Sequence, residues 1–153
     1  LKQAVDSVLH DRKKAQVVIM GDFNDYYSNR SVSEVLGAKP VSTLKANKQE
    51  LYHLLAAKEN ATKDYGSYRY RGKWDSLDHL IVNGRLLRQK GSFHILPSDD
   101  AFLVKADVFS ADFLLEDDER YGGKLPLRTY SGMRYKGGYS DHLPIYADFL
   151  LKY

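Results

Sequence analysis

Three short strings hold most of the side chains in this sequence that could do chemistry. They are Gly21-Asp22-Phe23-Asn24, Leu77-Asp78-His79-Leu80-Ile81-Val82 and Tyr139-Ser140-Asp141-His142-Leu143-Pro144-Ile145. Each places acids, an amide or an imidazole beside a hydrophobic run that is typical of a strand. Carboxylates hold hard cations or orient water, an amide donates to a phosphate oxygen, and an imidazole transfers protons. These residue types suit a site for a phosphate group and a metal ion.

Asp22 and Asn24 directly follow the run Val17–Met20, which predicts a strand buried on both faces. In a sheet flanked by helices, such a strand end is where ligands bind, and the two-residue spacing lets both side chains point to one side. The alternative is an ordinary turn, because Gly, Asp and Asn also favour turns for conformational reasons.

Asp78 is predicted to share one face of a strand with Leu80 and Val82, while His79 points the other way. Burying a carboxylate on an apolar face is costly without a partner. His142 is our candidate, since a carboxylate fixes the tautomer of a neighbouring histidine. A structural salt bridge from Arg69 or Arg71 is the alternative.

Asp141 and His142 stand at the start of another predicted strand. Neighbouring residues of an extended chain point to opposite faces, so both reach one site only if the backbone turns there. The glycine pair 137/138 just upstream allows such a bend. Taken alone, an Asp-His dipeptide is a weak signal of function.

The remaining pattern predicts three helices and several short strands. We expect helices over Leu1–Leu9, from Ser31 with a capping box to Glu34 and a stop at Gly37, and over Glu50–Lys58. We expect a hairpin in which the turn Arg71-Gly72-Lys73 separates Tyr68–Tyr70 from Leu77–Val82, and further strands in Ser92–Pro97 and Leu143–Leu151. The pattern therefore predicts one α/β (α+β) domain over residues 1–153, with a long insert at about 98–138.

Composition limits the function only broadly. The 153 residues carry a net charge of +3 and no apolar run long enough to span a membrane. The absence of cysteine excludes disulfides, thiolate nucleophiles and zinc–cysteine sites, and it fits either a reducing or an oxidising compartment. Because the chain opens at Leu1 within a helical pattern, we expect it to be part of a longer polypeptide.

In the order and content of its three strings, the sequence resembles the endonuclease/exonuclease/phosphatase (DNase I-like) family. The match rests on Gly-Asp-Phe-Asn at 21–24, Asp78 and Ser-Asp-His at 140–142. It covers most of the chain but corresponds to the C-terminal half of the family's domain. The resemblance implies half of a four-layer β-sandwich flanked by helices, and the hydrolysis of phosphoester bonds by activated water.

The resemblance also implies a role for each matching residue. Asp22 would orient the attacking water and contact a metal ion, and Asn24 would hold the phosphate. Asp141 would bind a divalent cation, Mg²⁺ with Mn²⁺ as a substitute. His142, oriented by Asp78, would bind phosphate oxygens or act as an acid or base.

One departure from the family concerns the metal. The family's main metal-binding Glu lies in the N-terminal half, and Gln49-Glu50 imitates its string only superficially. We therefore expect this chain to carry part of a site, to need the missing N-terminal half, and otherwise to self-associate. A nucleic acid, a lipid and a small molecule all stay open as the phosphoester substrate. A non-catalytic module that recognises phosphate is the alternative function.

Overall fold

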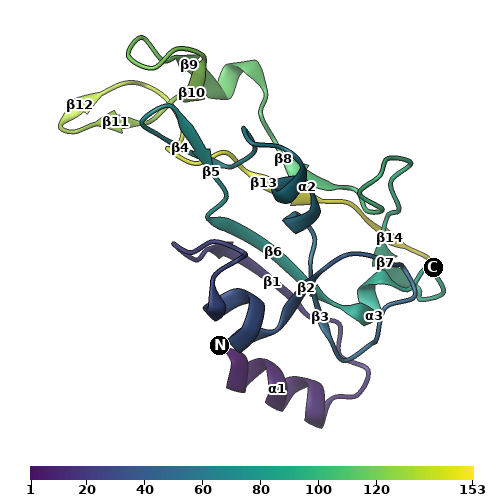
Figure 1. Ribbon diagram of the computed structural model, residues 1–153. Helices are drawn as coiled ribbons and strands as arrows, with labels where there is room; N and C mark the ends of the chain where they lie inside the picture. The colour runs from purple at the N-terminus through teal and green to yellow at the C-terminus, as the bar shows by residue number, and fades with distance from the viewer.

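The computed structural model describes all residues from Leu1 to Tyr153. Its main sheet has four strands in the order β1-β6-β3-β2, namely Val18–Asp22, Asp78–Asn83, Leu51–His53 and Ala38–Pro40. Strand β6 runs antiparallel to both neighbours, and β2 runs parallel to β3. Strand β6 reaches from one end of the sheet to the other (Figure 1). The candidate carboxylates Asp22 and Asp78 both lie at the same end of the sheet.

One face of the sheet is covered by the N-terminal helix and a short helical turn. Helix α1 (Lys2–Asp11) buries Val5 and Leu9, and η1 (Ser31–Leu36) adds two further apolar side chains to the same cluster around Ile81. Helix α1 confirms the helix predicted over Leu1–Leu9. The helical spacing of its apolar residues places them on the face that is buried against the sheet. Figure 1 shows α1 alongside the sheet.

The other face packs against a second layer built from two strand pairs. Strand β8 (Ala106–Val108) pairs with β13 (Ile145–Ala147), and β7 (Phe93–Ile95) pairs with β14 (Phe149–Leu151). Their inward side chains meet Leu80, Val82 and the short helix α3 (Gly84–Leu87) in the larger hydrophobic core. The result is an α+β architecture of stacked sheets, as expected, and the strands predicted in Ser92–Pro97 and Leu143–Leu151 are present.

The strand predicted over Val17–Met20 is present as β1, but the prediction that it is buried on both faces is wrong. Strand β1 lies at the edge of the sheet, and the second layer packs over β6 rather than over β1. Val18 and Met20 are therefore 42% and 71% exposed, whereas Ile19 packs toward the α1 side. One face and one edge of β1 stay open.

The helix predicted over Glu50–Lys58 is also wrong. Residues Leu51–His53 form β3, which is buried and hydrogen-bonded on both sides within the sheet, and helix α2 begins only at Ala56 and ends at Ala61. Pairing with two neighbouring strands outweighs the weak helical spacing of the leucines, because local propensity is easily overridden by tertiary contacts.

The helix predicted from Ser31 is present, and it ends at Gly37, whose φ of 75° requires the left-handed region. The predicted capping box, however, is not formed. The residue before the helix is Arg30, and the Ser31 hydroxyl donates to Asp25 instead of capping a backbone amide. Glu34 forms an ion pair with Arg30 at 2.9 Å.

The hairpin around Arg71-Gly72 is formed, but with a different second strand. Strand β4 (Tyr68–Tyr70) pairs with β5 (Lys73–Asp75), and Leu77–Val82 continues into β6 of the main sheet. The turn residues Arg71 and Gly72 have φ of 50° and 82°, values that fit a tight two-residue hairpin loop.

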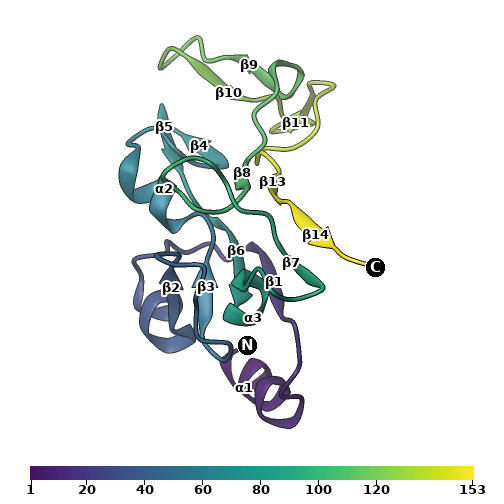
Figure 2. The same cartoon turned by 90° about the vertical axis from the view of Figure 1, so that its right-hand side faces the viewer.

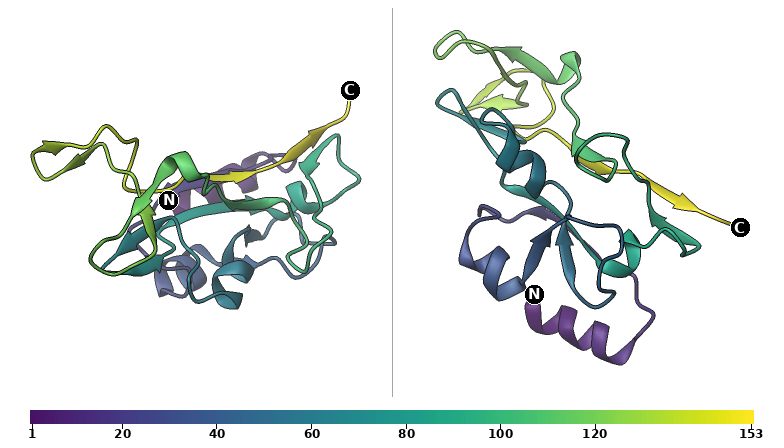
Figure 3. Two further views of the ribbon diagram at one scale, coloured as in Figure 1. Left: turned by 90° about the horizontal axis from the view of Figure 1, so that it is seen from above. Right: turned by 45° about the vertical axis from the view of Figure 1, so that its right-hand side comes forward.

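The segment predicted as a long insert holds most of the remaining short elements. They are η2 (Asp112–Leu114), β9 (Leu115–Asp117), β10 (Lys124–Pro126), β11 (Tyr130–Ser131) and β12 (Arg134–Tyr135), in addition to β8. Figure 2 shows β9 to β11 at the end of the molecule opposite α1, and Figure 3 shows β14 and the C terminus leaving on another side. None of the helices has the length and the apolar character that a membrane span requires.

Candidate functional site

The site lies where β1 ends beside the first residue of β6. In the register of this antiparallel pair, Asp22 lies directly opposite Asp78, so the two carboxylates project from the same face. Like charges placed opposite each other repel. This end of the sheet therefore favours a nearby cation or hydrogen-bond donor.

Asp22 is held in a turn with Asn24. The Asn24 backbone N–H donates to Asp22 Oδ1 at 2.8 Å, and the Asn24 amide Nδ2 donates to Oδ2 at 3.3 Å. Gly21 at φ 138° and Asn24 at φ 50° supply the unusual backbone conformations. The turn interpretation is thus correct for the local structure, and both side chains are exposed.

Asp78 pairs with His142, as the sequence predicts. His142 Nδ1 lies 2.6 Å from Asp78 Oδ2, and the Ser67 hydroxyl donates to the same oxygen. The alternative partner, Arg69, donates instead to the carbonyl oxygens of Gly72 and Gly122. The carboxylate on the apolar strand is therefore satisfied by an imidazole and a hydroxyl.

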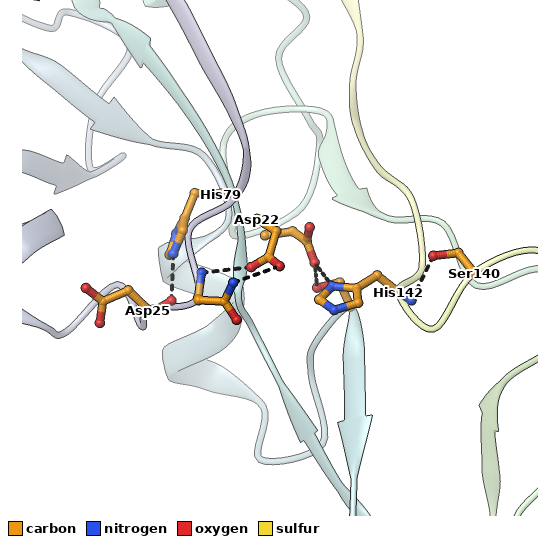
Figure 4. Close-up of polar contacts among 8 residues, drawn as sticks. Asp22, Asp25, His79, Ser140 and His142 are labelled. Atoms are coloured by element: carbon orange, nitrogen blue, oxygen red, sulfur yellow. Dashed lines mark hydrogen bonds and ion pairs between the residues drawn. The ribbon is translucent and has the colours of Figure 1, made fainter. Parts of the chain in front are cut away.

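The bend before the last strands aims His142 at Asp78. The Ser140 hydroxyl accepts the His142 backbone N–H at 3.1 Å, and the Tyr68 ring stacks on the imidazole with centroids 4.7 Å apart. Figure 4 shows His142 between Ser140 and Asp22. Because Nδ1 is engaged by the carboxylate, Nε2 is left as the free nitrogen for acid or base chemistry.

Asp141 stands apart from these contacts. Its side chain is exposed and makes no hydrogen bond or ion pair within the chain, and no group of three or more His, Asp or Glu side chains could hold a metal ion. As carboxylates, Asp22 and Asp141 are each of the donor type that Mg²⁺ takes, together with several waters and substrate oxygens. The metal-binding role of both residues stays a prediction.

A buried pair of histidines, His53 and His79, contacts the loop next to the site, and the sequence analysis missed this pair. His53 Nδ1 accepts the Leu55 N–H at 3.2 Å, His53 Nε2 lies 2.5 Å from His79 Nδ1, and His79 Nε2 lies 2.9 Å from the Asp25 carbonyl oxygen. These partners fix one tautomer for each ring, with both Nε2 atoms protonated. Figure 4 shows the last contact, from His79 to Asp25.

Both histidines of this pair are neutral. Burial, and then the neighbouring His79, lowers the pKa of His53 to about 3, and burial also lowers the pKa of His79. The orientation of His79 away from Asp78 follows from strand alternation. The contact of His79 with His53 could not be predicted from the sequence. Residues 50–58 have the spacing of a helix, whereas His53 lies in a strand.

These features define a class of protein in which acids, an amide and an oriented imidazole meet at one end of stacked α+β sheets. The chain belongs to the Endonuclease/Exonuclease/phosphatase family, whose model matches residues 1–151. Membership implies a DNase I-like fold and indicates phosphoester hydrolysis in general, the activity of a hydrolase. Comparison with curated proteins and with solved structures gave no significant match.

Proposed function

We propose that this chain contributes part of the active site of a divalent-metal-dependent phosphoester hydrolase, of the nuclease or phosphatase type. The observation that carries the proposal is the pair of His142 Nδ1 and Asp78 Oδ2 at 2.6 Å, next to Asp22 across the β1–β6 ladder. A carboxylate that orients an imidazole beside a second, exposed carboxylate suits attack by water on phosphorus.

His142 is the proton-transferring or phosphate-binding group in this proposal. Asp78 holds Nδ1–H, so Nε2 faces the substrate either as a base or, once protonated, as a hydrogen-bond donor to a phosphate oxygen. The Ser67 hydroxyl donates a second hydrogen bond to Asp78 Oδ2 and keeps that carboxylate in place. Stacking on Tyr68 restricts the ring plane of His142.

Asp22 orients the attacking water, and Asn24 binds the phosphate. The amide of Asn24 now contacts Asp22 through a 3.3 Å hydrogen bond, which is near the long limit for such bonds. Turning the amide toward a phosphate oxygen costs little and frees Asp22 Oδ2 for water. The backbone bond to Oδ1 at 2.8 Å keeps the carboxylate oriented during this exchange.

Asp22 and Asp141 are the residues that would hold Mg²⁺, or Mn²⁺ in its place. A bound divalent cation would supply positive charge to the phosphate oxygens. Since no cluster of three ligands occurs within the chain, we propose that the remaining ligands come from an N-terminal half of the domain. The open face of β1, with Val18 and Met20 exposed, supports the same division and favours self-association when that half is absent.

The proposal is tested with hydrolysis assays on the chain alone and on the polypeptide that adds the N-terminal half. Substrates are plasmid DNA, a chromogenic phosphodiester, sphingomyelin and inositol phosphates, each with Mg²⁺ and with EDTA. We expect Mg²⁺-dependent turnover only from the longer polypeptide, at least a hundredfold slower in His142→Ala and unchanged in the exposed control His10→Ala.

Three results would each overturn a part of this proposal. Robust turnover by the chain alone, lost in His142→Ala, would show that the site is complete within these residues. Phosphate binding without turnover of any substrate by the longer polypeptide would favour a non-catalytic recognition module. A monodisperse monomer in sedimentation velocity would argue against self-association of the chain.

A further inference from the structure

A hollow of about 490 Å³ lies between the β4–β5 hairpin and the segment that carries β9 to β12. Figure 1 shows these elements together at one end of the molecule. Charged side chains dominate its wall: five are cationic, two are acidic, and they are Arg69, Arg71, Arg120, Arg128 and Lys136 with Glu116 and Asp118. The positive excess makes the hollow a candidate site for anions.

Both acids of the hollow are already engaged. Lys136 Nζ lies 2.8 Å from Glu116 Oε2, and Arg69 lies 3.9 Å from Asp118 Oδ2. Asp118 Oδ1 also accepts the backbone N–H groups of Arg120 and Tyr121. The acids therefore do not neutralise the other three arginine side chains.

Those three arginines share one arrangement. Each guanidinium lies over a tyrosine ring, and none has a carboxylate partner: Arg71 over Tyr70 at 5.1 Å, Arg120 over Tyr121 at 5.2 Å and Arg128 over Tyr68 at 5.8 Å. A stacked guanidinium is ordered, while its in-plane N–H donors stay available to an oxyanion. The Nε of Arg128 is buried and has no hydrogen-bond partner.

The hollow is connected to the proposed catalytic histidine through a single side chain. Tyr68 stacks on His142 at 4.7 Å and carries the Arg128 guanidinium at 5.8 Å. A substrate whose reacting phosphate lies at His142 therefore needs to extend past only one ring to place a second anionic group among the arginines.

We propose that this hollow binds a second phosphate group of the substrate, separate from the one that is cleaved. The substrate is accordingly a compact molecule with several phosphate groups. This assignment of the occupant as substrate rests on the function proposed above, whereas the anion site itself does not.

Charge distribution favours a compact anion over a nucleic-acid strand. Residues 85–138 contain nine Lys and Arg against eight Asp and Glu, a nearly neutral balance that does not predict a continuous basic stripe for a nucleic-acid backbone. Three guanidiniums around one space suit clustered phosphates, because each binds an oxyanion through two donors.

The test is isothermal titration calorimetry on the chain in EDTA, with myo-inositol hexakisphosphate, inorganic phosphate and a single-stranded oligonucleotide as probes. We expect the hexakisphosphate to bind most tightly. Arg71→Gln and Arg128→Gln should each weaken its binding about tenfold, as expected for one charged hydrogen-bonding group. Arg71→Lys, which keeps the charge but loses the planar fork, should weaken it by a smaller factor.

The matched control is Arg134→Gln, an exposed arginine on β12 that does not line the hollow. An equal loss in this control would show that binding reflects net charge alone and would overturn the proposal. Tighter binding of the oligonucleotide would replace it with a nucleic-acid track, and no binding of any probe would assign the stacked arginines a purely structural role. Circular dichroism of each variant confirms folding.

These measurements are independent of catalysis. Binding in EDTA that survives a failure of every hydrolysis assay would refute only the proposed function. If hydrolysis is found, Arg71→Gln should raise KM for a multiply phosphorylated substrate and leave KM for a singly phosphorylated one unchanged. An equal rise for both substrates would contradict the assignment of a second phosphate.

Discussion

The buried histidine pair should make the contribution of His53 to folding depend on pH. The pKa of His53 is lowered from 6.5 to about 3 in the folded state, so only the unfolded chain takes up this proton as the pH falls below 6.5. The stabilisation by His53 is therefore present above pH 6.5 and lost progressively toward pH 3. At pH 5 the loss is about 2 kcal/mol, from 1.36 kcal/mol for each pKa unit.

Glu59 acts in the opposite direction and hides this effect in the wild-type profile. Burial raises the pKa of Glu59 to about 7, and its Oε2 is buried with no hydrogen-bond partner. The folded state then takes up this proton first, so stability from Glu59 rises as the pH falls from 7 toward 4.5. Because Glu59 is present in the wild type and in a histidine variant alike, its effect cancels in their difference.

The informative quantity is the difference in free energy of unfolding between the wild type and His53→Gln. We expect it to shrink by about 2 kcal/mol between pH 7 and pH 5. Urea titrations followed by circular dichroism at pH 7, 6 and 5 measure it. The control is His10→Gln, which removes a histidine whose side chain is 88% exposed and lies outside the buried pair. If the difference in free energy of unfolding between the wild type and His53→Gln is the same at pH 5 and pH 7, the neutral, buried pair is refuted.

Three further predictions concern the site and the bend that positions it. Asp78→Asn should lower kcat by about 10²-fold or more in the longer polypeptide, because Asn no longer holds the Nδ1–H tautomer of His142; an unchanged kcat would remove Asp78 from the mechanism. Ser67→Ala should cost about 1 kcal/mol of stability in urea titrations, since one donor to Asp78 is lost, and no change would show that water replaces the hydroxyl. Gly138→Ala should strongly destabilise the chain, because the added Cβ would lie 2.1 Å from the Leu127 carbonyl oxygen; a melting temperature equal to the wild type would contradict this contact.

The parts of the site that the sequence predicts depend on local rules. Strand alternation places Asp78 and His79 on opposite faces of β6, and the need of a buried carboxylate for a partner points to His142. The helical spacing of Val5 and Leu9 likewise predicts α1. For α1 and for the two faces of β6, one short stretch contains all the information that the prediction needs. The partner of Asp78 is 64 residues further along the chain, and it is predicted from the chemistry of a carboxylate and an imidazole.

The errors arise where distant contacts decide the structure. Leu51–His53 becomes a strand because β2 and β6 bond to it from both sides, and Met20 is exposed because the second layer does not extend over β1. Neither neighbour can be identified from the residues themselves. The missed histidine pair follows from the first error, since His53 meets His79 only once β3 lies beside β6.

Strand β6 links the two hydrogen-bond systems of the site through consecutive residues. Asp78 contacts His142 on one face, and His79 on the other face contacts the Asp25 carbonyl oxygen in the loop that follows Asp22. A slip of the β1–β6 register by one residue would exchange these faces, burying the carboxylate and removing the support of the loop. The buried residues Leu80 and Val82, which lock that register through the larger core, therefore set the geometry of a site that they do not contact.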